Sequence, residues 1–376
     1  MRIGINALYL IPGGVGGTEI YLRELLAAFA RIDPENEYIV FTNRETEPAI
    51  VPARDNFTHS PQDVSASSRP ARILYEQLIL PASLRRLQID VLFNPGFTTP
   101  IFTRARRVTT FHDLQHKRHP EYFRWFDLPF WQMLLWMSAH ASDAVVAPSE
   151  ATRKDLLKYY RLDEESIHVV PHGVEPEFQA IAHERALAAG NGGKKLLLCV
   201  STLHPHKNLD RLVRAFQRFH TRHPDYELVI AGLRGFFAER LDRAIELADL
   251  THSVRLTGWI PREDLYALYR RAEAFVYPSR FEGFGMPVLE AIAAGVPLAC
   301  SDIPPLKEVA GDCAVYFPPD DEELMLDALE RIAFDKPARE RLIREGPERA
   351  AGFTWDLAAR STLRAFESAL RPRRKK

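Results

Sequence analysis

Two glutamates in a glycine-rich segment carry the most specific chemical signal in the sequence. Glu282 and Glu290 flank a stretch that contains Gly283, Gly285 and Pro287, directly after an apolar run. The glycines let the chain bend, Pro287 suits the first turn of a helix, and free N–H groups at a helix N-terminus receive phosphate. We expect Glu290 in that first turn. Carboxylates beside a phosphate would be repulsive unless they bind hydroxyl groups, so the pattern predicts a sugar nucleotide. The alternative is that Glu290 is only a first-turn acid favoured by the helix dipole.

A single lysine marks a second loop. Lys207 is the only lysine between Lys195 and Lys307, in a chain that contains 10 Lys and 39 Arg. It follows another short apolar run, and Asn208 is placed to cap the helix expected to begin there. A compact ammonium at a helix N-terminus suits a phosphate as a point charge. Lys207 therefore indicates phosphate binding, with an exposed surface lysine as the alternative.

Four glycines within residues 13–17 follow the first apolar run and precede a helix-like segment. Glycine allows the backbone to approach a ligand, and a helix start favours anions. The loop does not fit the dinucleotide fingerprint because, counting from Gly14 and Gly16, the third glycine would fall at Glu19. No Gly-Lys-Ser/Thr follows, which excludes an ATPase-type phosphate loop. The loop is expected to contact an anion or a sugar, or else to be only a tight turn.

A histidine ends another short apolar run. His112 and Asp113 follow the apolar residues 107–111, and ligands of parallel sheets bind beyond the carboxyl ends of the strands. We therefore expect His112 to contact a ligand. His116 and His119 follow, but their spacing is not that of zinc ligands, and no metal is expected. The chain also lacks Asp-x-Asp, an arrangement that often holds a divalent metal on a diphosphate.

The elements that must position these residues alternate along the chain. Short apolar runs predict strands, and segments with 3.6-residue periodicity between them predict helices, which together indicate parallel, doubly wound sheets. The predicted strands span residues 2–8, 38–42, 89–93, 107–111, 143–147, 167–170, 195–201, 226–231, 253–256, 274–277, 297–300 and 314–316. In the first half the predicted helices span residues 18–31, 72–87, 121–141 and 149–160, and from 321 onward the pattern is helical.

A glycine-rich polar break at residues 188–195 divides this series into two, which predicts two sheets with a cleft between them. We expect a first domain over residues 1–180, a linker over 181–194 and a second domain over 195–353. Residues 354–376 are expected to form a helix that packs back on the first domain and ends in a basic tip. A single long sheet is the alternative.

Composition narrows the class of protein. The 376 residues include 49 Lys and Arg against 50 Asp and Glu, a net charge of −1, with 46% hydrophobic residues. These values are typical of a globular protein and argue against whole-domain capture of nucleic acid. Three cysteines without CxxC spacing predict buried thiols in a reducing compartment. No apolar run reaches 18 residues, so we expect a cytoplasmic protein that does not span a membrane.

Seven aromatic residues lie between residues 121 and 137, including Trp125, Trp131 and Trp136. Packing of a helix on the first domain is the favoured interpretation. The alternative is contact with a lipid-linked acceptor or a membrane surface, to which the basic residues 371–376 would add electrostatic attraction. If this alternative holds, we expect the protein to lie peripherally at the inner face of a membrane.

These motifs together resemble the retaining glycosyltransferases of family 4, the group 1 transferases. Glu282 and Glu290 match the Glu-x7-Glu signature of that family, and residues 205–209 look like its Pro-Arg-Lys-Asn-Leu motif. His112-Asp113 and the stretch 169–174 also resemble the branch that contains bacterial O-antigen mannosyltransferases. The similarity runs from about residue 2 to 360, nearly the whole chain.

The resemblance implies a GT-B fold of two Rossmann-like domains, with the donor bound mainly by the second. It implies that Glu282 contacts the transferred sugar, Glu290 the ribose and Lys207 the diphosphate. It also implies that His112 lies beside the sugar near the acceptor. The remaining implied donor contacts are the amides of Phe284, Gly285 and Met286, the loop around Gly258, Trp259 and Ile260 beside the base, and Gly16 and Gly17 beside the donor phosphate.

Two positions depart from the family pattern. Many relatives carry an arginine about five residues before the lysine, where Thr202 stands here, and His206 replaces the usual arginine next to the lysine. Either the diphosphate is less completely neutralised, or Arg280 or another arginine substitutes.

The resemblance implies retaining, metal-independent transfer of a hexose, with mannose favoured, from a nucleotide-diphosphate sugar to a glycan or lipid-linked acceptor. Front-face attack is implied, whereas a covalent sugar intermediate is the other route to retention. A sugar-nucleotide epimerase and a catalytically silent sugar-nucleotide-binding protein are the competing interpretations.

Overall fold

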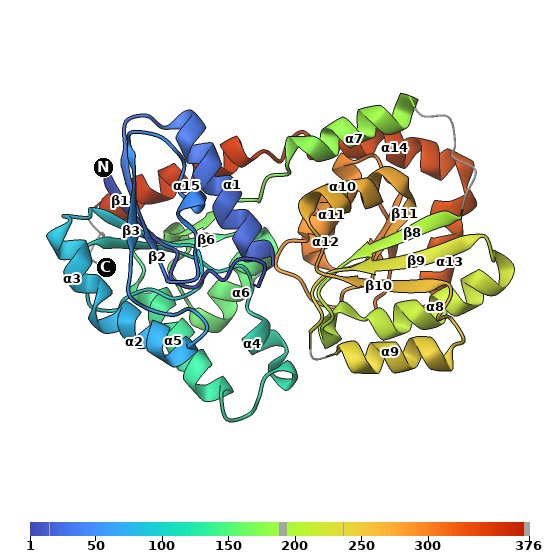
Figure 1. Cartoon of the computed structure of the whole chain (residues 1–376), viewed down its shortest axis with the longest axis horizontal. Helices are drawn as coiled ribbons and strands as arrows, with labels where there is room; N and C mark the ends of the chain where they lie inside the picture. The colour runs from blue at the N-terminus through green and yellow to red at the C-terminus, as the bar shows by residue number, and fades with distance from the viewer. Residues whose placement is uncertain (15, 188–193, 236, 372–376) are drawn as a thin grey trace. The chain divides into compact units, whose positions relative to one another are not determined.

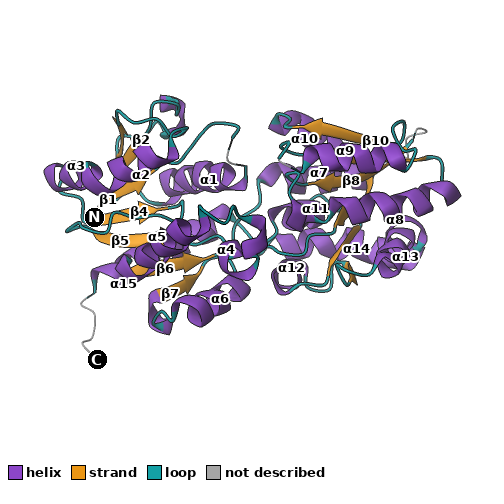
Figure 2. Cartoon of the chain, turned by 90° about the horizontal axis from the view of Figure 1, so that it is seen from below, coloured by secondary structure: helices purple, strands orange, loops and turns teal. Residues whose placement is uncertain are grey.

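The computed structural model describes residues 1–14, 16–187, 194–235 and 237–371, and its chain divides into two compact units (Figure 1). The first unit comprises Met1–Gly173 together with the C-terminal segment from Trp355. The second unit comprises Val174–Thr354. Each unit is built around its own parallel sheet, with helices on both faces (Figure 2). The α/β class expected from the alternating pattern is thus confirmed.

The first unit contains a seven-stranded sheet in the order β3-β2-β1-β4-β5-β6-β7, with every neighbouring pair parallel. The strand order reverses between the parallel neighbours β1 and β4. From β1 the chain adds β2 and β3 toward one edge of the sheet, and from β4 it adds β5, β6 and β7 toward the other edge. Its strands are β1 (Arg2–Asn6), β2 (Glu37–Thr42), β3 (Phe57–Pro61), β4 (Val91–Asn94), β5 (Arg106–Thr110), β6 (Ala144–Ala147) and β7 (Ile167–Val169).

The C-terminal helix belongs to this first unit. Phe366 of that helix packs against Phe29 and Phe93, with ring centroids 6.0 and 5.3 Å apart, and Arg31 pairs with Asp356 at 2.6 Å. The helices of the unit are α1 (Gly17–Ile32), α2 (Arg69–Leu78), α3 (Leu80–Arg86), α4 (Gln115–Arg118), α5 (Leu128–Ala141), α6 (Glu150–Tyr160) and α15 (Trp355–Leu370), with short 3₁₀ turns η1 (Pro48–Ile50), η2 (Pro120–Tyr122) and η3 (Glu164–Ser166).

The second unit contains a six-stranded parallel sheet in the order β10-β9-β8-β11-β12-β13. Helices α8, α9 and α13 cover one apolar face of it, and α7, α10, α11, α12 and α14 cover the other. The strands are β8 (Lys195–Val200), β9 (Tyr226–Ala231), β10 (Val254–Gly258), β11 (Ala272–Tyr277), β12 (Leu298–Ser301) and β13 (Val315–Phe317). The helices are α7 (Pro176–Leu187), α8 (Leu209–Arg222), α9 (Ala238–Leu247), α10 (Arg262–Arg271), α11 (Met286–Ala293), α12 (Pro304–Ala310), α13 (Glu322–Phe334) and α14 (Lys336–Ala350), with the 3₁₀ turn η4 (Pro205–Lys207).

One strand of the first unit was not expected, and two of its expected helices differ from the structure. The edge strand β3 was not predicted, because four of its five residues are not large and apolar and its pairing with β2 is what extends it. The helix expected over 72–87 is divided at Ile79, since Pro81 has no N–H to continue the helical bonds. The helix expected over 121–141 begins only at Leu128, with Pro129 in its first turn.

The expected boundary at residue 180 also differs. Helix α7 belongs to the second unit, because Phe178 and Ile181 are buried in that unit's core beside Tyr269. The expected linker from residue 181 therefore begins inside α7, and the glycine-rich residues 188–193 lie outside the described part of the chain. The basic tip 372–376 lies outside it as well. No described helix is both long and apolar enough to span a membrane.

Candidate functional site

The topology of the second unit brings two of the predicted loops together. Strands β8 and β11 are neighbours at the point where the strand order reverses, and Leu198 pairs with Phe275. Parallel strands end at the same edge of a sheet, and ligands of such folds bind at this reversal. The loop that carries Lys207 after β8 therefore lies beside the loop that carries Glu282 after β11.

Lys207, Glu282 and Tyr277 form a closed triangle of contacts. The Lys207 Nζ lies 2.6 Å from Glu282 Oε1 and 3.0 Å from the Tyr277 hydroxyl, which donates to the same carboxylate oxygen at 2.8 Å. The side chains of Lys207 and Glu282 are 14% and 13% exposed. Burial and the neighbouring Glu282 carboxylate raise the pKa of Tyr277, so its hydroxyl remains a donor. The result is a partly exposed acid–cation pair with a fixed geometry.

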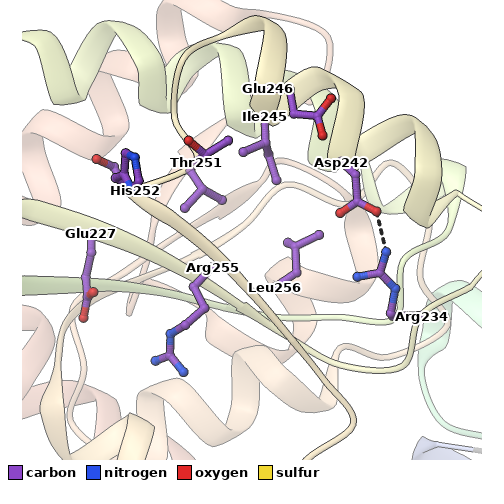
Figure 3. A pocket seen from close by; sticks show the side chains of 11 residues that line it. Glu227, Arg234, Asp242, Ile245, Glu246, Thr251, His252, Arg255 and Leu256 are labelled. Carbon is purple, nitrogen blue, oxygen red and sulfur yellow. Dashed lines mark hydrogen bonds and ion pairs between the residues drawn. The ribbon is translucent and has the colours of Figure 1, made fainter.

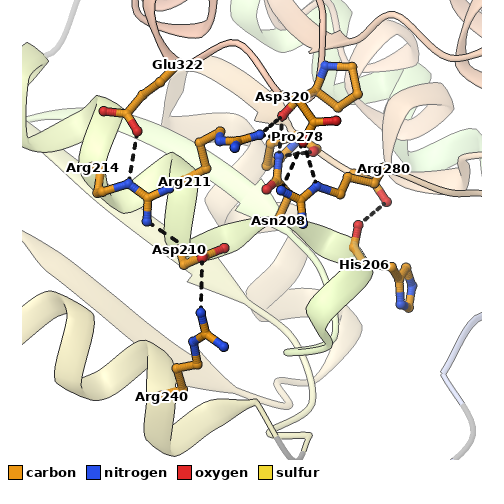
Figure 4. Close-up of polar contacts among 12 residues, drawn as sticks. His206, Asn208, Asp210, Arg211, Arg214, Arg240, Pro278, Arg280, Asp320 and Glu322 are labelled. Atoms are coloured by element: carbon orange, nitrogen blue, oxygen red, sulfur yellow. Dashed lines mark hydrogen bonds and ion pairs between the residues drawn. The ribbon is translucent and has the colours of Figure 1, made fainter. Parts of the chain in front are cut away.

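Asn208 occupies the position expected of a helix cap but does not cap α8. Its backbone is left-handed, with φ of 59°, and its amide nitrogen donates to the carbonyls of Pro278 and Pro319 at 3.1 and 2.7 Å (Figure 4). The expectation of a side-chain cap is therefore wrong. A side chain that bonds two other loops cannot also turn back to its own helix. Asn208 instead ties the Lys207 loop to the end of β11.

Arg280, considered as a substitute for the missing arginine, is bound to a carboxylate. Its guanidinium lies 3.0 Å from Asp320, and Arg211 donates to the same oxygen at 2.6 Å (Figure 4). The Arg280 backbone N–H donates to the His206 carbonyl at 2.8 Å, which joins the two loops again. These contacts hold the loop that carries Lys207 in place, and the guanidinium charge of Arg280 is paired with the carboxylate of Asp320.

The amides predicted to face phosphate lie at the start of α11. Met286 is the first residue of that helix, Gly285 precedes it with φ of 110°, and Phe284 is buried in the core of the second unit. A Cβ atom on Gly285 would lie 2.4 Å from Leu306 Cδ2. Glycine is thus required here both by backbone conformation and by space.

We expect replacement of Gly285 by alanine to lower the free energy of unfolding by about 2–3 kcal/mol, because left-handed strain and a steric clash add. Gly258 is the control, since its φ is 70° and a Cβ atom on it would meet nothing within 4 Å. Gly258→Ala should cost only about 1 kcal/mol, from backbone strain alone. Urea unfolding measures both values. Equal losses in the two variants would contradict the contribution assigned to Leu306.

Glu290 lies in the second turn of α11, so the expectation of a first-turn position is wrong. The helix begins at Met286, one residue before Pro287. Because of this early start, the side chain of Glu290 lies on the face of the helix that packs against the core. The Tyr269 hydroxyl donates to its carboxylate at 3.0 Å, and Arg262 donates to it at 3.2 Å. Burial raises the pKa of Glu290, while Arg262 opposes that rise.

Arg262 also binds a second buried carboxylate. It donates to both oxygens of Glu175, through Nε at 3.2 Å and through Nη2, and Tyr266 donates to Glu175 as well. Burial lowers the pKa of Arg262, but the carboxylates of Glu290 and Glu175 outweigh it and raise that pKa overall. One guanidinium therefore compensates two buried carboxylates, a combination that the sequence pattern alone did not indicate.

The loop expected to face the base follows β10. Gly258 ends that strand with φ of 70°, Trp259 is 58% exposed, and Ile260 packs on the core of the second unit. Trp259 is thus an exposed aromatic surface next to the ordered Ile260.

A separate pocket of about 660 Å³ lies beside the edge strand β10 (Figure 3). An ion pair between Arg234 and Asp242 closes one side of it. The residues predicted to bind the donor do not line this pocket. Its lining comes from β9, β10, α9 and their connections, namely Glu227, Arg234, Asp242, Ile245, Glu246, Thr251, His252, Ser253, Val254, Arg255 and Leu256.

In the first unit, the glycine loop is held by the helix that it opens. Glu19 of α1 accepts from the Gly13 N–H at 2.8 Å and pairs with Arg23 at 2.8 Å. Gly16 has φ of 60°, and a Cβ atom on it would meet nothing within 4 Å, while Gly17 begins α1. Gly16 therefore faces open space at the start of α1, as a ligand-contacting loop requires.

His112 is held in an aromatic cluster that reaches the same helix. Its ring lies edge-on to Tyr21 of α1 with centroids 4.9 Å apart, and its Nε2 lies 2.8 Å from the Pro95 carbonyl. Burial lowers the pKa of His112 to about 4, so the ring is neutral at pH 7 and donates from Nε2, which makes Nδ1 an acceptor. Tyr21 also contacts His172 and Trp355, so the first residue of α15 joins this cluster.

The other two histidines considered for a metal have protein partners. His116 Nε2 lies 2.6 Å from the Tyr160 hydroxyl, and His119 pairs with Glu121 at 2.9 Å. In the described part of the chain, no group of three or more His, Cys, Asp or Glu side chains is arranged to hold a metal ion. Cys199, Cys300 and Cys313 are buried free thiols, as expected.

The structure thus groups the predicted residues within each unit. Lys207 and Glu282 meet in the second unit, with the α11 amides on the segment that follows Glu282, and His112 meets the helix opened by the glycine loop in the first unit. The prediction missed Tyr277, Arg262 and Glu175. Tyr277 could have been found, since it is the last residue of β11 and ends at the same sheet edge as Lys207.

Two family models match the chain. The model described as "Glycosyltransferase Family 4" matches residues 15–178, and the one described as "Glycosyl transferases group 1" matches residues 182–349. Together they cover nearly all of both units.

Curated relatives and solved structures agree with these matches. The chain is 28% identical over 291 residues to O-antigen chain mannosyltransferase B of Escherichia coli, covering 76% of each, and 29% identical over 223 residues to O-antigen chain mannosyltransferase RfbU of Salmonella typhimurium, covering 59% of this chain and 60% of that relative. The fold is similar to that of sucrose-phosphate synthase from Thermosynechococcus elongatus, with a TM-score of 0.79, 18% identity and 98% of each chain covered.

Proposed function

Because the chain belongs to the group 1 glycosyltransferases of family 4 and has their GT-B fold, we propose that it transfers a hexose from a nucleotide-diphosphate sugar to a glycan or lipid-linked saccharide. The observation that carries this proposal is the contact of Lys207 with Glu282 at the reversal point of the second sheet. A cation for a diphosphate and a carboxylate for sugar hydroxyls lie there within 2.6 Å of each other.

Mannose is the proposed sugar, and polysaccharide or lipopolysaccharide biosynthesis the proposed process. Two relatives named as O-antigen chain mannosyltransferases support this choice. A cytoplasmic site of reaction is proposed because Cys199, Cys300 and Cys313 are free thiols, which persist in reducing compartments.

The proposed reaction retains configuration by front-face attack. The acceptor hydroxyl oxygen bonds to the anomeric carbon, the bond from that carbon to the diphosphate oxygen breaks, and the acceptor proton passes to the departing oxygen. Lys207 stabilises the charge that develops on the diphosphate, and Glu282 orients the sugar through its hydroxyls. The amides at the start of α11 face the phosphates, and the neutral His112 offers Nδ1 to a hydroxyl of the sugar or acceptor.

The second carboxylate is proposed to bind the ribose. Arg262 and Tyr269 orient the Glu290 carboxyl group in a buried site, which suits acceptance of hydrogen bonds from two ribose hydroxyls. No metal ion is required in this scheme, because Lys207 and helix amides supply the positive electrostatic potential that a metal would otherwise provide.

We expect nucleotide release from GDP-mannose in the presence of a saccharide acceptor, unaffected by EDTA. A screen of UDP-, GDP- and dTDP-sugars, with product analysis, tests this. Loss of transfer on chelation would contradict metal independence. Conversion of a nucleotide sugar without an acceptor would identify an epimerase, and binding without turnover of any donor would identify a silent binding protein.

A further inference from the structure

The helix α5 exposes apolar side chains on the side that is not packed. Leu135 and Ala139 are buried in the core of the first unit, whereas Phe130, Met133 and Trp136 recur about one turn apart and are 49%, 55% and 47% exposed. This helix carries no Lys, Arg, Asp or Glu between Leu128 and Ala141. The packing expected for this segment therefore accounts for only one of its two faces.

Neighbouring segments extend this surface. Gln77 of α2 accepts from the Ile101 N–H at 2.9 Å, and the Thr99 N–H donates to Ser138 of α5 at 3.4 Å, so a loop joins the two helices. Arg69 at the start of α2 lies over the ring of Trp131, 4.9 Å from its centroid. In Figure 1 α2 and α5 accordingly lie next to each other. We define the apolar face as the exposed residues of these segments: Leu74, Leu78, Ile79, Phe102, Trp125, Phe126, Phe130, Met133 and Trp136.

Arginines border the apolar face. Residues 69–140 contain ten Lys or Arg against five Asp or Glu. Three of these cations, Arg106, Arg107 and Arg118, are paired with Asp143 and Asp155, which lie outside this range. Arg69, Arg104 and Arg124 are exposed. Arg69 lies over the ring of Trp131. In the sequence, Arg104 follows Phe102 of the apolar face by two residues, and Arg124 directly precedes Trp125. Within the described residues none of these three arginines forms an ion pair. Their charge is therefore available to an anionic partner.

We propose that the apolar face binds the surface of an anionic lipid bilayer. Aromatic side chains on a helix without charged residues suit the boundary between headgroups and acyl chains, and the adjacent arginines suit anionic headgroups. A second copy of the chain is a poorer occupant. A twofold contact through this face would bring two positively charged rims together, which like-charge repulsion opposes. Nine of the 17 large apolar side chains that are exposed in the described part of the chain lie in these segments, and such a concentration marks an interaction surface.

Co-sedimentation with vesicles of phosphatidylcholine, with and without phosphatidylglycerol, tests the proposal. We expect binding to the anionic vesicles that weakens as salt rises. The double variant Trp125→Ser, Trp136→Ser should bind at least about tenfold more weakly than the unaltered chain. Arg124→Gln should bind about fivefold more weakly. Leu247→Ser is the matched control, because Leu247 is 88% exposed on α9 of the second unit. It should bind as the unaltered chain does.

Equal binding by the double variant and the unaltered chain would overturn the proposal, as would absence of binding to anionic vesicles. A dimer in light scattering that the double variant abolishes would identify a second copy as the occupant instead. Circular dichroism verifies that each variant is folded. Nucleotide release with a saccharide acceptor in solution should be the same in all variants, so failure of the lipid proposal is distinguishable from failure of the proposed transfer reaction.

Discussion

Replacement of Glu282 by glutamine is expected to lower kcat for sugar transfer by at least about 10²-fold, and Lys207→Met should do the same. The reason is that both side chains are held at fixed distances, 2.6 Å from each other and 2.8 and 3.0 Å from the Tyr277 hydroxyl. Preorganised charges of this kind act on charge that develops in the transition state and need no reorganisation when it forms. Steady-state kinetics with saturating donor measures the loss in kcat.

A structural explanation for that loss must be separated from a chemical one. Each single variant leaves one charge without its partner in a site that is only 13–14% exposed, so each should also be less stable. The double variant Lys207→Met, Glu282→Gln removes both charges together. It should recover most of the stability in thermal unfolding while remaining inactive. Recovery of activity in the double variant would contradict the proposed roles.

Arg280 provides the matched control for the lysine. It lies on the same loop system, but its guanidinium is bound to Asp320 together with that of Arg211. Arg280→Met should therefore change kcat by less than about fivefold. A loss as large as that of Lys207→Met would mean that Arg280 replaces the arginine that Thr202 does not supply.

The parallel sheets and most of their strands could be predicted because strands that are buried on both faces consist of short apolar runs. The strand β12, Leu298–Ser301, is buried throughout and was expected at residues 297–300. The edge strand β3 has one buried face at most, so its residues carry no such signal. Its extended form depends on backbone pairing with β2, which is a property of the folded sheet.

The candidate site was predictable where its residues belong to one loop, and less so where distant segments meet. Lys207 and Glu282 were each identified from local context, but their ion pair depends on β8 and β11 being neighbours. Arg262 and Glu175 are 87 residues apart, and neither has a distinctive local pattern. Asn208 was assigned a cap from its position, although the competing carbonyls of Pro278 and Pro319 come from loops far along the chain.

Replacement of Arg262 by methionine should lower the free energy of unfolding by about 3 kcal/mol near pH 7. The guanidinium forms ion pairs with both buried carboxylates, Glu175 and Glu290, so its loss leaves them without that compensation. Methionine fills a similar volume against Phe178 and Tyr266, over whose rings Arg262 lies. Urea unfolding measures the change. Donor KM should rise as well, because Glu290 is the proposed ribose ligand and loses the group that orients it.

The loss of stability should depend on pH with a defined sign. Burial already raises the pKa of Glu290 above its ordinary value of 4.5, and removal of Arg262 takes away an interaction that lowers it. A carboxyl with a raised folded pKa favours the folded state most below its unfolded pKa, and this contribution is lost as the pH rises through the folded pKa. The free energy of unfolding of Arg262→Met should therefore differ less from that of the unaltered chain near pH 5 than near pH 7.

The exposed pair of Arg271 and Glu227 supplies the matched control for this prediction. Its atoms are 3.4 Å apart and the two side chains are 55% and 23% exposed, so Arg271→Met should cost less than about 1 kcal/mol at either pH. Adding Glu290→Gln to Arg262→Met removes one uncompensated charge and should restore part of the stability near pH 7 but not the donor KM. If Arg262→Met were equally destabilised at both pH values, ionisation of Glu290 would not be the cause, and loss of packing over the aromatic rings would explain the effect.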